Sequence, residues 1–278
     1  MYMKKENQNQ TLISFHGKQE IKDKYLKRLQ QHYDLDEIVQ GHYWENGKGC
    51  AVGCTIHSNR HDNYDTELGI TWRLALLQDS LFEKLSNKDA KEFPLQFLNA
   101  IPVGVDTNLI FKKFIIWNLV DEKEGLVSIM KDGKEKDILI RVANLYNESF
   151  HREIEQKEWK VLADESYTSA SASAYTSASA SAYAYASAYA SASAYTSAYA
   201  SASAYASAYA YASASASASY KEMFNKRIIR MRDKLLELMI KSGKWEKERI
   251  DITKSLAVLP PDETSDSELI NKKEEVNI

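Results

Sequence analysis

Cysteine is scarce in this chain: Cys50 and Cys54 are its two cysteines, which are too few for a disulfide scaffold. Long apolar runs are absent as well, because no stretch approaches the ~20 consecutive apolar residues of a membrane-spanning helix. Residues 1–11 are polar, so we expect no secretory signal. These absences predict a cytoplasmic protein without a membrane partner, in a reducing compartment where both thiols stay free.

An excess of charge of either sign is also absent. The chain has 36 Lys+Arg against 39 Asp+Glu, a formal net charge of −3, so nucleic acid is not indicated as a partner. Charged side chains are missing altogether from residues 166–220, although they are frequent on both sides of it. This change in composition separates a head, residues 1–165, from an uncharged tract, residues 166–220.

The head is long enough to bury a core of its own, and its apolar spacing predicts a mainly α-helical domain. Apolar side chains recur three and four residues apart, and turn residues such as Gly41 and Asn87 separate the periodic segments. Pro94 predicts a boundary or kink. Helices are expected over residues 19–40, 70–85, 92–100 and 137–163, with a further helix capped by Asp106 or Thr107.

The uncharged tract repeats with a strict period of two. From Tyr167 to Ser219 every odd position is Ser or Tyr, and every even position is Ala apart from three threonines. Alanine favours a helix, whereas a period of two would place all the tyrosines on one face of a strand or β-solenoid. The lack of aliphatic residues larger than alanine also allows disorder. We favour the helix and keep the other two conformations open.

The C-terminal part begins with an amphipathic segment over residues 221–242. Its apolar positions, spaced by four and three residues in turn, are Phe224, Ile228, Met231, Leu235 and Leu238. This heptad spacing suits either a helix that packs onto the head or a coiled coil that joins two copies of the chain. Residues 243–278 are charged and contain Pro260-Pro261, so we expect a mobile tail there.

Chemistry is suggested by one glycine-rich segment, residues 47–61, which contains both cysteines and two histidines. On a continuous helix Cys50, Cys54, His57 and His61 would fall at positions i, i+4, i+7 and i+11. Four reactive or metal-ligating side chains would then share one narrow stripe on the helix surface. If the segment is one continuous helix, the spacing thus predicts that these four side chains lie together.

A cysteine nucleophile is one interpretation of this stripe. The glycines before Cys50 could place it at the N-terminus of a helix, where the helix dipole favours the thiolate. His57 or His61 would then act as the base. Candidates to orient that base are Asp62, Asp65 and Glu67, and alternative bases for Cys50 are His16, His32 and His42.

Zinc is a second interpretation, because Cys-x3-Cys-x2-His-x3-His offers the ligand types that zinc prefers, although at a spacing unlike that of the usual fingers. Gly47, Gly49 and Gly53 also resemble a phosphate-binding loop, but no apolar strand precedes them and no Gly-Lys-Ser/Thr motif is present. The third interpretation involves no cofactor: small cysteines suit tight cores, and histidines often lie at core edges.

Several short blocks of the sequence resemble a family of uncharacterised bacterial and phage proteins. The blocks are Phe15-His-Gly, Tyr43-Trp44, Gly47-Lys-Gly-Cys-Ala-Val-Gly-Cys-Thr55 with His57 and His61, and Glu67-Leu-Gly-Ile70. Similar proteins carry an Ala/Ser-rich repeat followed by an Asp-Lys-Leu-Leu-Glu-Leu segment, here residues 233–238. They usually have proline in place of Thr71, and charges within the repeat. The family has no established activity, so the resemblance implies an organisation and no mechanism.

Together these features predict an intracellular interaction or assembly protein. Repeats need neighbours or partners to bury their faces, so we expect self-association through the repeat tract and the heptad segment, or binding to another protein. One alternative is a cysteine-dependent hydrolase or acyltransferase-like enzyme that uses Cys50 or Cys54 with a histidine. The other is a zinc-stabilised binding module built on Cys50, Cys54, His57 and His61.

Overall fold

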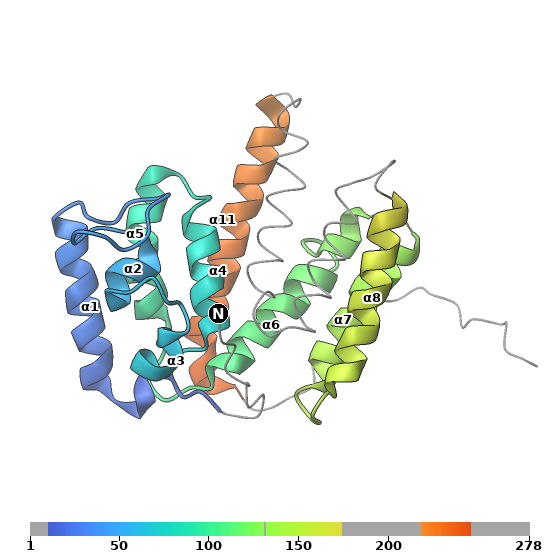
Figure 1. The fold of residues 1–278 in the computed structure, drawn as a ribbon, viewed down its shortest axis with the longest axis horizontal. Helices are drawn as coiled ribbons and strands as arrows, with labels where there is room; N and C mark the ends of the chain where they lie inside the picture. Colours follow the sequence, from blue (N-terminus) through green and yellow to red (C-terminus); the bar gives the residue numbers. More distant parts are fainter. Residues whose placement is uncertain (1–10, 131, 174–217, 246–278) are drawn as a thin grey trace, which may run out of the picture.

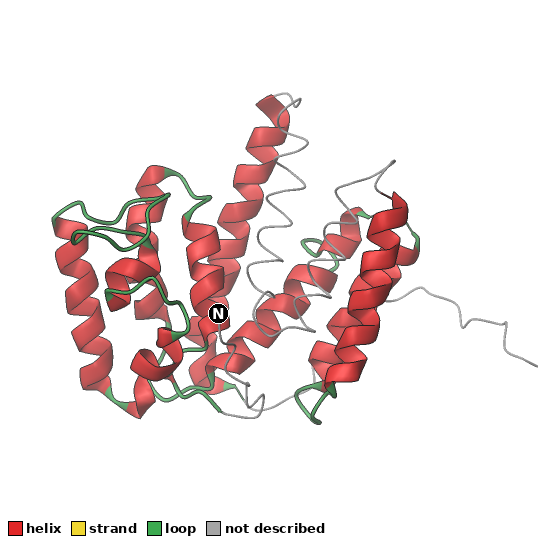
Figure 2. Cartoon of the chain, in the orientation of Figure 1, coloured by secondary structure: helices red, strands yellow, loops and turns green. Residues whose placement is uncertain are grey.

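The computed structural model describes residues 11–130, 132–173 and 218–245 (Figure 1). Within these residues the chain is mainly helical, as predicted, and has no β-strand (Figure 2). The helices are α1 (Gln19–Asp34), α2 (Ala51–Ile56), α3 (Asn63–Leu68), α4 (Trp72–Phe82), α5 (Asn87–Ala100), α6 (Thr107–Val120), α7 (Lys134–Glu148), α8 (Gln156–Ser173) and α11 (Ala218–Lys241). Short 3-10 helices span Ser14–Gly17, Leu126–Ile129 and Ser242–Lys244.

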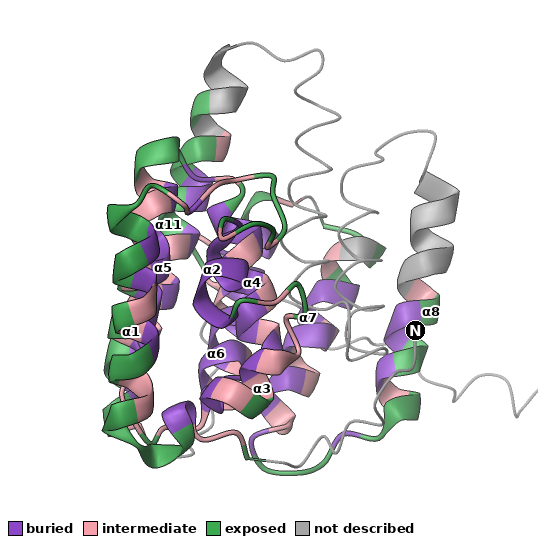
Figure 3. Cartoon of the chain, turned by 60° about the vertical axis from the view of Figure 1, so that its left-hand side comes forward, coloured by how far each residue is buried: buried purple, intermediate pink, exposed green. Residues whose placement is uncertain are grey.

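The segment that carries the cysteines forms α2 and its N-cap, and α1, α3, α4 and α5 surround it. α1 packs against α2 and α5, and α2 also contacts α4 and α5. Every residue of α2 is buried, because this short helix lies among longer ones (Figure 3). The cysteine segment is therefore held by packing from several sides.

α6 is the central helix of the molecule. It is buried on most of its surface, and it contacts α4, α7 and α11. α7 and α8 lie on one side of it, and α11 lies on the side of α4 (Figure 1). Although α6 is strongly apolar, the described part of the chain contains no helix with the length and hydropathy needed to cross a membrane.

The heptad segment forms α11, and its apolar seam packs within the chain. Ile228, Met231 and Leu235 are buried, and α11 contacts α4, α5 and α6. A buried polar contact adds to this packing, because Arg227 Nη2 donates a hydrogen bond to Asn118 Oδ1 at 2.7 Å. The seam is thus covered by the head itself.

The prediction of a single helix over residues 137–163 is wrong, because this stretch forms two helices, α7 and α8. Phe150 and Ile154, in the segment between them, are both buried in the core. α8 then continues into the start of the uncharged tract, up to Ser173. Residues 174–217 lie outside the described residues. The prediction that they form a helix, with β-solenoid and disorder as alternatives, therefore stays a prediction.

The described residues that follow α11 pack against the head. Ser242 is buried in the 3-10 helix that follows α11, and Gly243 lies against Pro102. The Lys113 ammonium lies 5.0 Å from the centre of the Trp245 ring. Residues 243–245 therefore belong to the head, which corrects the predicted boundary at 243, and residues 246–278 lie outside the described residues.

Candidate functional site

Cys50 lies at the start of α2, as the glycines before it predict. It is the N-cap residue, and its Sγ accepts a hydrogen bond from the backbone N–H of Gly53 at 3.4 Å. Its own backbone N–H donates to the carbonyl oxygen of His42 at 2.8 Å. The thiol is therefore fixed in position, and Cys50 is 4% exposed.

The glycines of this segment allow the backbone of Trp44 to pack closely against α2. A Cβ atom on Gly49 would lie 2.9 Å from Cα of Trp44, and one on Gly53 would lie 3.0 Å from Cβ of Trp44. Gly47 lies in the tight turn between Trp44 and Gly49 with a φ of 85°, a conformation that favours glycine. Close packing thus explains the glycine pattern that resembles a phosphate-binding loop.

The predicted helical stripe does not form, because α2 ends at Ile56. His57 adopts a left-handed backbone conformation, with a φ of 53°, and caps the helix. Cys50 and His57 therefore lie at opposite ends of a six-residue helix, and His61 lies in the loop beyond it. The prediction that Cys50, Cys54, His57 and His61 share one helix face is wrong.

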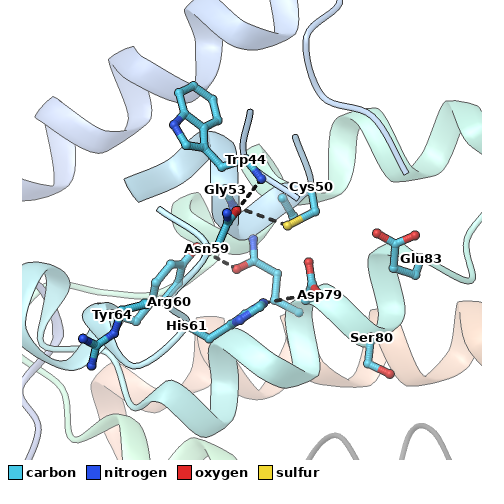
Figure 4. A network of polar contacts seen from close by, with 12 residues as sticks. Trp44, Cys50, Gly53, Asn59, Arg60, His61, Tyr64, Asp79, Ser80 and Glu83 are labelled. Atoms are coloured by element: carbon cyan, nitrogen blue, oxygen red, sulfur yellow. Dashed lines mark hydrogen bonds and ion pairs between the residues drawn. The ribbon is translucent and has the colours of Figure 1, made fainter. Parts of the chain in front are cut away.

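The loop after α2 instead brings His61 back to Cys50, where Asp79 of α4 meets both of them (Figure 4). One donor atom from each of the three side chains lies within 4.8 Å of the other two. His61 Nε2 lies 3.2 Å from Asp79 Oδ2, and these two side chains are 17% and 15% exposed. We call these three residues the Cys50 cluster.

Polar contacts hold the loop that carries His61. The side-chain oxygen of Asn59 accepts a hydrogen bond from the backbone N–H of Trp44 at 2.5 Å, which ties this loop to the one before α2. The buried hydroxyl of Tyr64 donates to Gln78 Oε1 at 2.9 Å, which ties α3 to α4 (Figure 4). The loop and the helix that form the Cys50 cluster are thus fixed relative to each other.

Two atoms of the Cys50 cluster are buried without a hydrogen-bond partner, namely His61 Nε2 and Asp79 Oδ1. Nε2 lies close to the other oxygen of the same carboxylate, yet the two groups do not have hydrogen-bond geometry. Buried polar atoms are nearly always hydrogen-bonded, so each exception needs an explanation. A thiol, an imidazole and a carboxylate that converge in this way are the ligand types of a zinc site.

Burial raises the pKa of the Cys50 thiol well above its ordinary value, and the negative charge of Asp79 and a hydrogen bond to its carboxylate raise it further. The thiol is therefore protonated at neutral pH. A cation bound beside it would act in the opposite direction, because it stabilises the thiolate. Glu83, one turn after Asp79, accepts a hydrogen bond from the backbone N–H of Gly41 at 2.7 Å, and burial raises its pKa.

Two of the four predicted site residues lie away from the Cys50 cluster. Cys54 is fully buried and its Sγ donates to the carbonyl oxygen of Gly49 at 3.3 Å, while burial raises its pKa to about 12. His57 stacks on Trp44 with ring centres 4.4 Å apart, and its Nε2 lies 2.8 Å from His32 Nε2. Cys54 is thus a core residue, and His57 belongs to a second group, which we call the His32–His57 pair.

The acidic residues that the sequence offers as partners for a histidine make other contacts. Asp62 pairs with a neighbouring arginine, Asp65 accepts the first backbone N–H of α4, and Glu67 accepts a tyrosine hydroxyl of α1. Of the alternative bases, His16 contacts a carbonyl oxygen of α3, His32 forms the His32–His57 pair, and the backbone of His42 holds Cys50.

Asp79 is the member of the Cys50 cluster that the sequence analysis missed. The apolar spacing of α4 predicts a buried face through Leu74, Leu77 and Leu81, and Asp79 lies on the opposite side of the helix. One signal does point to it: Arg73 and Asp79 are the charged residues of an otherwise uncharged helix. An acid retained in such a helix is a candidate for a specific partner.

Comparisons with known proteins add no further information. Family models, curated proteins and solved structures were all searched, and none of them matches the chain. The resemblance to a bacterial and phage family therefore stays a prediction, and the site is interpreted from its own geometry.

Proposed function

We propose that this chain is a zinc-binding protein in which Cys50, His61 and Asp79 hold a single ion. Thiolate sulfur, imidazole nitrogen and carboxylate oxygen are the ligands that zinc takes in proteins. The observation that carries the proposal is the convergence of three such donor atoms within 4.8 Å of one another. The ligand set differs from the predicted one, because Asp79 stands in it instead of Cys54 and His57.

The separation of the imidazole and carboxylate donor atoms suits tetrahedral coordination. Zinc lies about 2.0–2.2 Å from nitrogen and oxygen ligands, so two such ligands at a tetrahedral angle are about 3.3 Å apart. His61 Nε2 and Asp79 Oδ2 are 3.2 Å apart. Ligands of one ion point at the ion and not at each other, which accounts for the missing hydrogen bond between these two groups.

Zinc also suits the charges of the Cys50 cluster. Zinc binding releases the proton of the Cys50 thiol, because the ion stabilises the thiolate. The thiolate and the Asp79 carboxylate together balance the two positive charges of the ion. The backbone N–H of Gly53 already donates to Cys50 Sγ, and this hydrogen bond would stabilise and orient the thiolate ligand.

Among the described residues, three protein ligands converge and leave a fourth coordination position to water. Four protein ligands usually close a structural zinc site, whereas three and a water are typical of a catalytic one. Water bound to zinc loses a proton near neutral pH and becomes a nucleophile. We therefore infer zinc-dependent hydrolysis as the class of reaction, at a largely buried ion whose ligands His61 and Asp79 keep part of their side chains exposed.

A cysteine nucleophile is the rival use of the same residues. It requires a thiolate that substrate can reach, and an imidazole whose two nitrogens face the thiol and the acid separately. The 4% exposure of Cys50 and its raised pKa both argue against this role. Alkylation of metal-free protein by iodoacetamide separates the two functions, because a nucleophilic Cys50 would react readily below pH 7.

Titration of metal-free protein with Co²⁺, followed by displacement with Zn²⁺, tests the zinc proposal. Co²⁺ bound by a thiolate absorbs in the near ultraviolet, so we expect this absorption to saturate at one equivalent. Cys50→Ser should abolish it. Cys54→Ser is the matched control, because Cys54 is equally buried but lies outside the Cys50 cluster, and it should still bind one equivalent.

Asp79→Asn and Glu83→Gln form a second matched pair on α4. Asp79→Asn removes a ligand charge with little change in shape and should weaken zinc binding at least about tenfold. Glu83→Gln removes a charge one turn away and should leave zinc affinity unchanged. Circular dichroism establishes that each variant is folded. Wild-type affinity in both Cys50→Ser and Asp79→Asn would overturn the proposal.

Self-association remains our proposal for the uncharged tract. The seam of α11 is covered by the head, so contacts between copies of the chain would be made by the repeat tract. A repeat needs a neighbouring repeat or a partner to bury its faces. We also propose a cytoplasmic location, since two free cysteines are typical of a reducing compartment.

A further inference from the structure

A pocket lies beside α1, at the end of α2 opposite to the Cys50 cluster. Its volume is about 420 Å³, within the range of pockets that bind small molecules. The lining residues come from α1, from the segment that follows it and from the C-terminal cap of α2. They are Lys24, Lys27, Arg28, Gln31, His32, Leu35, Glu37 and His57. We call this the α1 pocket.

Positive charge dominates the α1 pocket. Lys24, Lys27 and Arg28 lie at positions i, i+3 and i+4 of α1, so they share one face of the helix. Both lysines are exposed, which leaves their ammonium groups within reach of a ligand in water. Glu37 is the acid in the lining, and its carboxylate lies 2.6 Å from His32 Nδ1. Three cationic residues thus line the pocket together with one carboxylate that already has a partner.

The His32–His57 pair forms a rigid polar wall of the α1 pocket. Its two Nε2 atoms are 2.8 Å apart, so one ring donates an N–H to the lone pair of the other. Glu37 holds the far nitrogen of His32, and the stacked ring of Trp44 holds His57. His32 is buried while His57 is exposed, so His57 is the imidazole that a ligand can reach.

Arg28 removes the main electrostatic obstacle to an anion in the α1 pocket. The carbonyl groups at the C-terminus of α2 carry partial negative charge and would repel an anion. Arg28 Nη1 donates to the carbonyl oxygen of Thr55 in that last turn at 3.0 Å. The guanidinium therefore places positive charge at the end of α2, in the lining of the pocket.

From these contacts we propose that the α1 pocket binds a small phosphate monoester. Three cations suit the two negative charges of a phosphate monoester better than the single charge of a carboxylate. Leu35 and the methylene groups of the lysines give the pocket apolar lining, which suits an organic group on the phosphate. This site is separate from the Cys50 cluster, with which it shares none of its lining residues.

Isothermal titration calorimetry with phenyl phosphate tests this proposal, with inorganic phosphate and benzoate as comparison ligands. We expect phenyl phosphate to bind one to one and more tightly than either comparison ligand. The double variant Lys24→Gln/Lys27→Gln should weaken its binding by about tenfold, since each exposed charge contributes a modest amount. A Debye length near 10 Å at 0.1 M salt predicts that added salt also weakens binding.

The matched control is Lys18→Gln/Lys123→Gln, which removes the same charge at two exposed positions outside the pocket lining. It should change the affinity less than twofold. Equal losses in the two double variants, or no binding by the wild type, would overturn the proposal. So would a benzoate affinity equal to that for phenyl phosphate. Titrations repeated with EDTA separate this site from zinc, because phosphate held by a metal would be lost and phosphate in the α1 pocket would remain.

Discussion

At the scale of single residues, His57 combines an unusual backbone with a perturbed ionisation. Burial lowers its pKa, and the charges of Arg28 and His32 lower it further, although Glu67 and Glu37 act in the opposite direction. The folded protein therefore binds a proton at His57 less tightly than the unfolded chain does, where the pKa is about 6.5. The stability that neutral His57 contributes is complete above about pH 6.5 and is lost as the pH falls below that value.

His57→Asn should accordingly flatten the pH dependence of stability. Asparagine tolerates the left-handed φ of 53° at this position, so the cap of α2 is retained. We expect the urea midpoint of the wild type to fall from pH 7.5 to 5.5 by more than that of the variant. Identical slopes for the two proteins would show that His57 does not control the acid sensitivity.

The site could be predicted only in part from its residues. Cys50 and His61 were indicated because their types suit zinc and thiol chemistry, and both lie in the Cys50 cluster. Asp79 was not, because its contact depends on how the loop after α2 returns to α4. His57 and Cys54 lie outside this cluster, since helical spacing cannot show where a helix ends. The left-handed cap at His57 separates residues that a longer helix would align.

At the scale of elements, a substitution in α11 can show whether its heptad seam belongs to the core of the head or joins two copies of the chain. Leu235 is fully buried in the seam, whereas Ile240 on the same helix is 65% exposed. Leu235→Ala should lower the free energy of unfolding by about 2–5 kcal/mol, as for other large-to-small core substitutions. Ile240→Ala, the control, should change it by no more than about 0.5 kcal/mol. Chemical denaturation measures both.

A different outcome would mean that α11 forms an interface between copies of the chain. If Leu235→Ala left the unfolding free energy of the monomer unchanged but weakened self-association in sedimentation, the seam would join copies of the chain. Spacing alone predicted the helix and its apolar face but not its partner, because the same heptad pattern suits a coiled coil and a docked helix. The partners, α4, α5 and α6, precede it by more than 90 residues in the sequence.

At the scale of the whole molecule, residues on both sides of the uncharged tract build one head. α11 packs on α4, α5 and α6, so the tract is an insertion between two parts of a single core. Replacing residues 174–217 with a Gly/Ser linker of equal length should therefore leave the melting temperature of the head nearly unchanged. If the tract mediates self-association, sedimentation velocity should show that the same replacement yields a monomer.

Either of two results would contradict this division of roles. A large fall in melting temperature would mean that the tract contributes to the core of the head. Unchanged self-association after replacement would mean that copies meet through another surface. The composition change at 166 marked the insertion in the sequence, but it could not show that the chain returns to the same core afterwards.

The most direct test of the zinc proposal is anomalous X-ray scattering at the zinc absorption edge from crystals grown with one equivalent of Zn²⁺. We predict one anomalous peak in the head, about 2.0–2.3 Å from Cys50 Sγ, a nitrogen of His61 and an oxygen of Asp79. The thiol, imidazole and carboxylate would then be the ligands of a single ion. A peak located elsewhere, or none at the Cys50 cluster, would contradict the proposal.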